Sequence, residues 1–215
     1  MKVRRAFKPY IWRPFKGSSF HGNVVLNFMR APRTEFAVYA HAYQEAGRRL
    51  TAELASRRGY RDVDACPIAF LYRHALELYL KSLIYWGNSL LRINKKTVVM
   101  NQRDLFRTHS LQRLVLAAKP IFRLSGALKS WPHPELKSFK HFERLVCHLE
   151  KIDPGSYSFR YPIDRKGGAA LPGHFCFNAI AFAEKIDAAL KLLDGASTWA
   201  YEEFQSYAEM MHRVG

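Results

Sequence analysis

The sequence predicts an all-α protein, an up-and-down bundle of five to six helices with a basic N-terminal extension. Residues 67–86, PIAFLYRHALELYLKSLIYW, are apolar on nearly every face of a helix, which is typical of a helix buried on all sides. Several other segments repeat apolar residues at the period of an amphipathic helix. Because no convincing set of strands accompanies them, helices packing on helices account for the domain.

We interpret residues 1–31 as the extension and residues 32–215 as the helical domain. The extension interleaves Lys and Arg with large aromatic residues, and it contains Pro9 and Pro14, whose spacing opposes a helix. Such an arm could track a phosphate backbone and stack on bases. It could also be a strap whose aromatic side chains pack on this bundle or on a protein partner. The sequence leaves both alternatives open.

The first predicted helix opens at Pro32 and Thr34 and ends at Gly59, since glycine commonly follows the last turn of a helix. A short polar connection leads to the central helix, which we expect to stop near Gly87. Beyond it, residues 93–100 fit either a short β-branched strand or an ordered loop.

The next helices are marked by caps and prolines. Thr108 can cap a helix that Pro120 bends or breaks. A Pro-flanked joint at residues 131–134 precedes an amphipathic helix with an apolar stripe over residues 136–149. The sequence Asp153-Pro154-Gly155 is a strong turn signal and ends that helix.

The last third of the chain is predicted to be helical again after a loop at residues 156–173, which is rich in glycine and charge. One helix covers residues 177–193 and is closed by Asp194-Gly195. A further helix covers residues 198–212.

The net charge of +16 is unevenly distributed. Residues 1–34 hold eight Lys/Arg and no acid, and residues 92–144 hold twelve Lys/Arg against three acids, so the remainder of the chain is about neutral. Two basic regions on an otherwise balanced protein indicate a polyanion partner, with nucleic acid as the leading candidate. The alternative is a solvated basic surface that aids solubility.

Three dispersed cysteines without a C-x-x-C pair favour reduced thiols in a cytoplasmic protein. No apolar region follows the basic N-terminus as in a signal peptide, and no uninterrupted apolar run is long enough to cross a bilayer, so we expect no membrane contact. The scattered histidines match no metal motif, and no phosphate-binding glycine loop is present. We therefore expect neither a metal nor a cofactor.

Four polar residues interrupt the central helix at helical spacing: Arg73, His74, Glu77 and Lys81. They could form a structural set of ion pairs, because Arg73, Glu77 and Lys81 follow one another at i,i+4. They could instead form the floor of a functional site. Either way they need partners from elsewhere in the chain. We expect a cationic turn from later in the chain, which carries Arg160, to fold onto them, and we assign His74, Glu77, Lys81 and Asp153 to one structural polar cluster.

Three segments resemble, in the same order, motifs of the HEPN superfamily of prokaryotic helical domains. They are HALELYLKSLI (residues 74–84), THSLQRL (108–114) and RYPID (160–164). In many members a central helix of this type is followed by a THDL-type helix start, and a TRYPD-like turn precedes the last core helix. The resemblance covers roughly residues 34–195 with gaps, and the order and spacing of the segments carry it.

The resemblance implies an up-and-down helical bundle, often a homodimer, with a part in toxin–antitoxin or antiviral defence systems. Many members are metal-independent endoribonucleases that use an R-x(4–6)-H motif at the start of the final core helix. In that chemistry a base takes the proton of the 2′-hydroxyl group, and a cation stabilises the charge that grows on the phosphorane.

This sequence departs from the family motif. After Arg160 the next histidine is His174, with thirteen residues between them. The one literal match, Arg103 with His109, lies at the THSL helix start and not at the family's catalytic position. The candidate catalytic residues are therefore Arg160, His109, His174 and Arg73.

Arg160 has a structural alternative, in which it fixes its turn by a salt bridge to Glu77 or Asp153. The candidate residues for nucleic-acid binding lie in the two basic regions. They are Arg4, Arg5, Lys8, Arg13, Lys95, Lys96, Arg103 and Arg107.

Three functions remain open at this point. The protein could be a HEPN-type ribonuclease, or a degenerate HEPN module that binds RNA or a nucleotide without cutting it. It could also be an interaction subunit that docks through its aromatic arm, with the charge merely adaptive.

Overall fold

The computed structural model describes residues 24, 26, 34–57 and 59–214. Contacts divide the chain into two units, residues 1–33 and residues 34–215, and the helices belong to the second. Apart from residues 24 and 26, the predicted extension lies outside the described residues, and so do its four candidate cations and Pro32.

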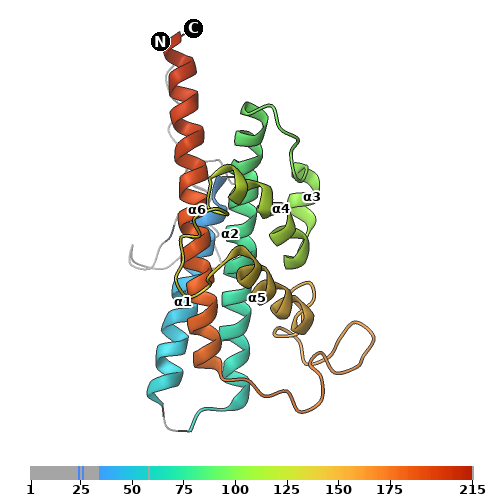
Figure 1. Ribbon diagram of the computed structural model, residues 1–215. Coiled ribbons are helices and arrows are strands. Elements are labelled where there is room, and N and C mark those ends of the chain that lie inside the picture. Colours follow the sequence, from blue (N-terminus) through green and yellow to red (C-terminus); the bar gives the residue numbers. More distant parts are fainter. Residues whose placement is uncertain (1–23, 25, 27–33, 58, 215) are drawn as a thin grey trace. The chain divides into compact units, whose positions relative to one another are not determined.

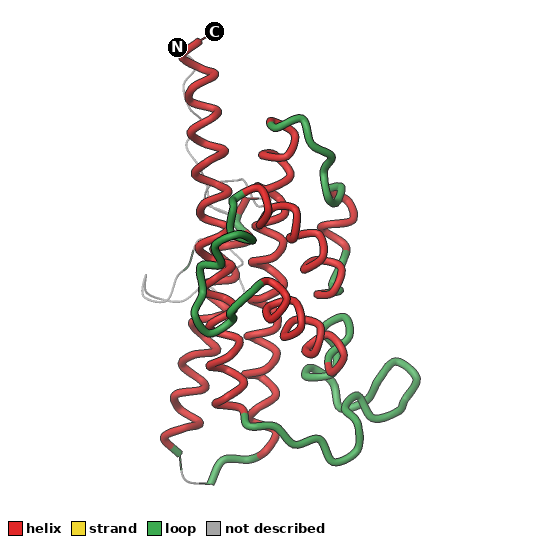
Figure 2. Tube along the Cα trace, in the orientation of Figure 1, coloured by secondary structure: helices red, strands yellow, loops and turns green. Residues whose placement is uncertain are grey.

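The described part of residues 34–215 contains six α-helices and one short 3-10 turn, so the predicted all-α bundle is confirmed (Figures 1 and 2). In chain order they are α1 (Phe36–Ser56), the 3-10 turn (Asp62–Asp64), α2 (Ala65–Ile93), α3 (Gln102–Arg107), α4 (Leu111–Leu124), α5 (Phe139–Ile152) and α6 (Ala179–Val214).

Helix α2 lies at the centre of the bundle. It packs against α1 and α6, which also contact each other, and against α4 (Figure 1). Residues 75–84 of α2 are buried without interruption, which is more than two full turns. The all-round apolar pattern of this segment thus corresponds to a helix surrounded by protein, as predicted.

Helix α5 packs on α4 through one apolar stripe, Phe139, Phe142, Val146 and Leu149, all buried. The ring of Phe122 on α4 meets the rings of Phe139 and Phe142 at centroid distances of 5.6 and 6.2 Å. Ser138 caps α5 by accepting a hydrogen bond from the His141 amide. This packing brings the last turn of α5 towards α2.

Gly87 does not end α2, which continues to Ile93. A Cβ atom at Gly87 would lie 2.4 Å from Cδ1 of Ile121 on α4. The glycine therefore serves close packing between two helices and not helix termination, which corrects the expected boundary.

Residues 94–101 form an ordered loop, so the loop alternative for residues 93–100 holds and the strand does not. The buried side chain of Asn88 accepts a hydrogen bond from the Val99 amide (3.0 Å) and donates one to the Met100 carbonyl (2.6 Å). The side chain of Asn88, and not the backbone of a neighbouring strand, thus bonds to these two polar groups of the loop. The loop leads into α3, a short helix that the sequence analysis did not predict.

Ser110, not Thr108, caps α4: its Oγ accepts a hydrogen bond from the Arg113 amide (3.3 Å). Thr108 instead ends α3 and is buried. Pro120 lies inside α4, and the helix continues to Leu124 because Ile121 and Phe122 after it are buried in the core.

The two helices expected near the C-terminus are one continuous helix, α6. Asp194-Gly195 does not close it, because Leu192, Leu193 and Ala200 on both sides are buried in one core. The cost of an interior glycine, roughly 1 kcal/mol, is smaller than the gain from this packing. Among the described residues, no helix is both long and apolar enough to cross a membrane.

Candidate functional site

Three charged side chains of α2 form a buried chain of ion pairs. Arg73 and Glu77 expose 0% and 1% of their side chains, and Lys81 exposes 4%. Arg73 Nη1 donates to Glu77 Oε2 (3.0 Å), and Lys81 Nζ donates to Glu77 Oε1 (2.9 Å). The i,i+4 spacing places all three on one face of the helix, as predicted.

The end of α5 and the connection before α4 complete the hydrogen bonding of Arg73. Its Nη2 donates to Glu150 Oε2 (3.2 Å) and to the His109 carbonyl (2.8 Å), and its Nε donates to the Asp153 carbonyl (3.2 Å). Asp153 Oδ2 lies 3.1 Å from the same Nε. Every nitrogen of the guanidinium group thus has an acceptor, which is what a fully buried cation requires.

Asp153 also organises the turn that follows α5. Its Oδ1 accepts a hydrogen bond from the Ser158 amide (2.5 Å), and its side chain is 1% exposed. Gly155 and Ser156 adopt positive φ angles of 67° and 63°, which reverse the chain. A turn from later in the chain therefore does meet the polar face of α2, but through the carboxylate of Asp153 and not through a cation.

His109 joins the cluster from its exposed side. Its Nδ1 lies 2.9 Å from Glu77 Oε1, and 58% of its side chain is exposed. An ionised carboxylate only accepts hydrogen bonds, so Nδ1 donates, and in the neutral form of the ring Nε2 is then an acceptor. Burial opposes ionisation of Glu77, but Lys81, His109 and Arg73 outweigh it and hold the pKa of Glu77 below its ordinary value.

Arg160 is exposed and makes neither of its expected salt bridges, with Glu77 or with Asp153. Its Nε donates to the Ser156 carbonyl, and its Cζ lies 5.5 Å from the centroid of the Phe70 ring on α2. Arg160 therefore fixes its turn through a ring and a carbonyl, while Arg73 makes the ion pair with Asp153.

His74 packs between aromatic rings instead of joining the ion pairs by a hydrogen bond. Its ring stacks on Phe70 (5.6 Å, 13°) and meets Tyr43 edge-on (4.5 Å). Burial lowers the pKa of His74, and the cations Lys81, Arg73 and Arg160 add to this effect against the attraction of Glu77. The ring is therefore held in its neutral form.

His174 is exposed in the segment before α6 and makes no hydrogen bond or ion pair with any described residue. No hydrogen bond or ion pair within the described chain joins it, or Arg160, to His109. Of the four candidate catalytic residues, the structure brings His109 and Arg73 together in one cluster.

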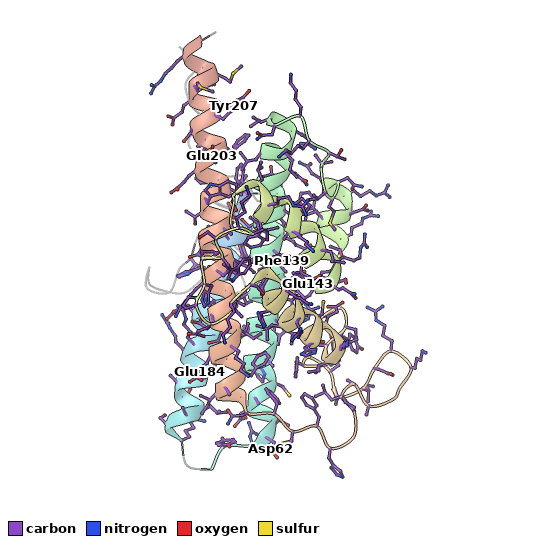
Figure 3. The ribbon with its side chains drawn as sticks, viewed as in Figure 1. Asp62, Phe139, Glu143, Glu184, Glu203 and Tyr207 are labelled. Carbon is purple, nitrogen blue, oxygen red and sulfur yellow. The ribbon has the colours of Figure 1, made fainter. Side chains whose placement is uncertain are left out.

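The cations of residues 92–144 are distributed from the last turn of α2 to α5. All twelve are exposed, and none forms an ion pair with a described acid: Arg92, Lys95, Lys96, Arg103, Arg107, Arg113, Lys119, Arg123, Lys129, Lys137, Lys140 and Arg144. Glu143 on α5, labelled in Figure 3, is one of the three acids in this region, and it too forms no ion pair with a described residue. We call these twelve residues the basic surface.

Arginines of α1 and the turn after it behave differently. Arg48 binds Asp187, with Nε 2.7 Å from Oδ1, and Arg49 binds Glu45 (3.3 Å). Arg57 and Arg61 bind Glu53 and Asp64. The contrast is thus one between paired arginines along α1 and, from the last turn of α2 to α5, cations that form no ion pair with a described acid.

Neither protein-family models, nor curated proteins, nor solved structures include a match for this chain. Residues 74–84 contribute Glu77 and Lys81, and residues 108–114 contribute His109, to the ion-pair cluster on α2. In residues 160–164, Arg160 instead lies over the Phe70 ring of α2.

Sequence reasoning missed Glu150, which accepts hydrogen bonds from both Arg73 Nη2 and the Leu111 amide (3.0 Å). Its signal was available: Glu150 and Asp153 are two acids one turn apart at the end of a predicted helix. Sequence reasoning also missed the stacked rings of Tyr157 and Tyr161, which lie 4.5 Å apart. Residues spaced i,i+4 are expected to meet only in a helix, and this segment was predicted to be a loop, so the contact was not expected.

Proposed function

We propose that this protein binds RNA through the basic surface, as a HEPN-like helical module. The observation that carries the proposal is that none of the twelve cations of this surface forms an ion pair with a described acid, whereas the arginines of α1 are paired. Free, exposed cations can exchange their counterions for phosphates, and that release drives nucleic-acid binding. The HEPN resemblance favours RNA over other polyanions.

Salt dependence tests this function. The affinity of the full chain for a single-stranded RNA is expected to fall linearly with salt on logarithmic axes, with a slope of about −0.7 per phosphate contact. The double variant Arg103→Gln/Arg107→Gln is expected to weaken binding and to make the slope shallower by about 1.4.

The matched control is Arg49→Gln/Arg57→Gln, which removes two exposed arginines that are paired with acids on α1. This control should leave both the affinity and the slope close to wild type. A protein that binds RNA with a flat salt response, or does not bind it, would contradict the proposal and leave the docking role of an interaction subunit.

Cleavage of RNA is the second candidate function, and the geometry of His109 favours it. Glu77 holds Nδ1, so Nε2 of the exposed ring is free to accept a proton. In the reaction, Nε2 takes the proton of a 2′-hydroxyl group, and that oxygen attacks the adjacent phosphorus. The bond to the 5′-oxygen breaks, the 5′-oxygen takes a proton from the imidazolium group or from water, and a 2′,3′-cyclic phosphate forms.

Arg73 is enclosed and fully hydrogen-bonded, so it would act by holding Glu77 and not by touching the phosphate. Arg160 stays the predicted cation for the phosphorane, and His174 the alternative imidazole. Cleavage is assayed with a labelled RNA in the presence of EDTA, and His109→Gln should abolish the cyclic phosphate product. A ribonuclease of the toxin or defence type should also poison its host on expression, and Arg160→Ala should relieve that effect. A product that persists in His109→Gln would contradict this role of His109.

The homodimer and the protein partner of residues 1–31 belong to the same proposal. The resemblance implies the dimer, and the aromatic residues of the extension favour the partner. Light scattering of the full chain measures whether it is a dimer. Its comparison with a chain that begins at residue 32 shows whether the extension takes part in self-association.

A further inference from the structure

The loop between α5 and α6 lines an open cavity of about 480 Å³. Its walls include Tyr157 and the cations Arg165 and Lys166, together with Pro154, Gly155 and Ala170. Neither Arg73 nor His109 lines it, so it is separate from the buried cluster. The volume lies within the range of sites that hold small organic molecules.

A stacked aromatic pair stands at this cavity. The rings of Tyr157 and Tyr161 lie 4.5 Å apart and 29° from parallel. The Arg165 guanidinium group lies over the Tyr157 ring, with Cζ 5.7 Å from the centroid. A planar, delocalised group therefore already occupies the position that a nucleobase would take on the same ring.

The tyrosine pair is anchored to the bundle. Arg160 lies between Tyr161 and Phe70 of α2, with Cζ 5.7 and 5.5 Å from their ring centroids. The stack thus continues from the cavity through a guanidinium group to the central helix. A platform held in this way loses little conformational freedom when a base binds.

The one acid on the cavity wall is engaged by the loop itself. Asp164 Oδ1 accepts hydrogen bonds from the amides of Lys166 (2.8 Å) and Gly168 (2.9 Å). Neither Arg165 nor Lys166 forms an ion pair with a described acid. Both side chains are exposed and available to a phosphate group.

We infer that this cavity binds one nucleotide of single-stranded RNA, with the base on Tyr157 and the phosphate at Arg165 and Lys166. The base takes the place of the Arg165 guanidinium group over the ring, and that group moves to the phosphate. The inference rests on the proposed function and deepens it, because it names an unpaired nucleotide as the unit recognised. A duplex keeps its bases stacked within the helix and cannot enter the cavity.

Binding of the full chain to a fluorescent single-stranded RNA, and to a duplex of the same length at the same salt concentration, tests the inference. Tyr157→Ala is expected to weaken binding of the single strand about 5- to 150-fold, the effect of losing one base stack, and to leave binding of the duplex unchanged. Tyr157→Phe keeps the ring and should bind like wild type. Tyr60→Ala is the matched control, because Tyr60 is exposed and makes no ring contact with a described residue.

Tyr157 is half-buried, so the melting temperature of each variant is measured as well. Arg165→Ala changes an exposed side chain and should also weaken binding of the single strand. If Tyr157→Ala unfolds, Arg165→Ala decides the matter. Single-strand affinity that survives in a folded Tyr157→Ala variant, or in Arg165→Ala in that case, would overturn the inference.

A free nucleotide offers the same chemistry as a nucleotide within RNA, and uridine monophosphate observed by NMR distinguishes the two sources. Uridine monophosphate that binds wild type but not Tyr157→Ala, in a protein that binds no RNA, would keep the cavity as a nucleotide site and overturn the proposed function. Salt-dependent RNA binding that is identical in wild type and Tyr157→Ala would keep the proposed function and overturn the cavity.

Discussion

Arg73 on α2 and Asp153 at the end of α5 form a buried ion pair between residues 80 positions apart, with Nε 3.1 Å from Oδ2. The N–H bond of Nε is directed at the Asp153 carbonyl, so Oδ2 contributes charge and not a hydrogen bond. The pair joins the central helix to the turn that begins the loop with the cavity lined by Tyr157, Arg165 and Lys166. It therefore couples the stability of the core to the shape of that loop.

Asp153→Asn keeps the shape of this side chain and removes its charge. We expect it to lower the free energy of unfolding by about 3 kcal/mol, because Arg73 loses one buried counter-ion. Glu77 and Glu150 remain beside Arg73, which places the loss at the low end of the range for broken buried pairs. Urea denaturation measures it. The control is Glu53→Gln at the exposed pair with Arg57, where at most about 1 kcal/mol is expected. Equal losses in both variants would contradict the buried pair's importance.

The neutral state of His74 predicts a pH dependence of stability. Because the pKa of His74 is lowered in the folded protein, the unfolded chain binds the extra proton first as pH falls below the ordinary value of 6.5. The contribution of His74 is therefore complete above pH 6.5 and declines as pH falls through the folded-state pKa. His74→Gln should flatten the dependence of unfolding free energy on pH in this range. The same change at exposed His148 should leave the dependence as it is, and a flattening there would argue against His74 as its source.

Two glycines inside helices should respond oppositely to alanine. At Gly87 the new Cβ would lie 2.4 Å from Ile121 Cδ1, so Gly87→Ala should destabilise the protein by about 1–3 kcal/mol. At Gly195 the Cβ meets open space, so Gly195→Ala should stabilise α6 by roughly 0.5–1 kcal/mol. Thermal unfolding of the two variants shows whether each substitution lowers or raises the stability of the protein. If Ile121→Val restores part of the stability lost in Gly87→Ala, the loss comes from this contact. If the two substitutions lower stability additively, it does not.

The side chain of Asn88 on α2 forms hydrogen bonds with the backbone of the loop before α3. Asn88→Ala leaves the Val99 amide and the Met100 carbonyl without partners in a half-buried place. We expect a loss of about 1–3 kcal/mol and faster hydrogen exchange of the Val99 amide. Asn94→Ala removes one bond to the Leu90 carbonyl at an exposed position, and it should cost well under 1 kcal/mol. Unchanged exchange at Val99 in Asn88→Ala would show that the loop is held by other contacts.

The helix boundaries show where local signals were insufficient. Gly87 and Asp194-Gly195 are both typical of helix ends, yet both lie inside helices. The energetic preference for a helix end at glycine is about 1 kcal/mol, and burial of the neighbouring leucines exceeds it. Ser110 replaced Thr108 as the cap of α4 for a related reason, since Thr108 lies in the core.

The amino-acid sequence by itself determined the all-α class, the central position of α2 and the ion pairs of Arg73, Glu77 and Lys81. Apolar periodicity and i,i+4 spacing are local properties, and they survive any arrangement of the other helices. Only the tertiary structure decided that Asp153 and Glu150 neutralise Arg73, that His109 meets Glu77, and that Arg160 lies on Phe70. These contacts join residues dozens of positions apart, and which acid reaches which base depends on the direction in which each helix enters the bundle.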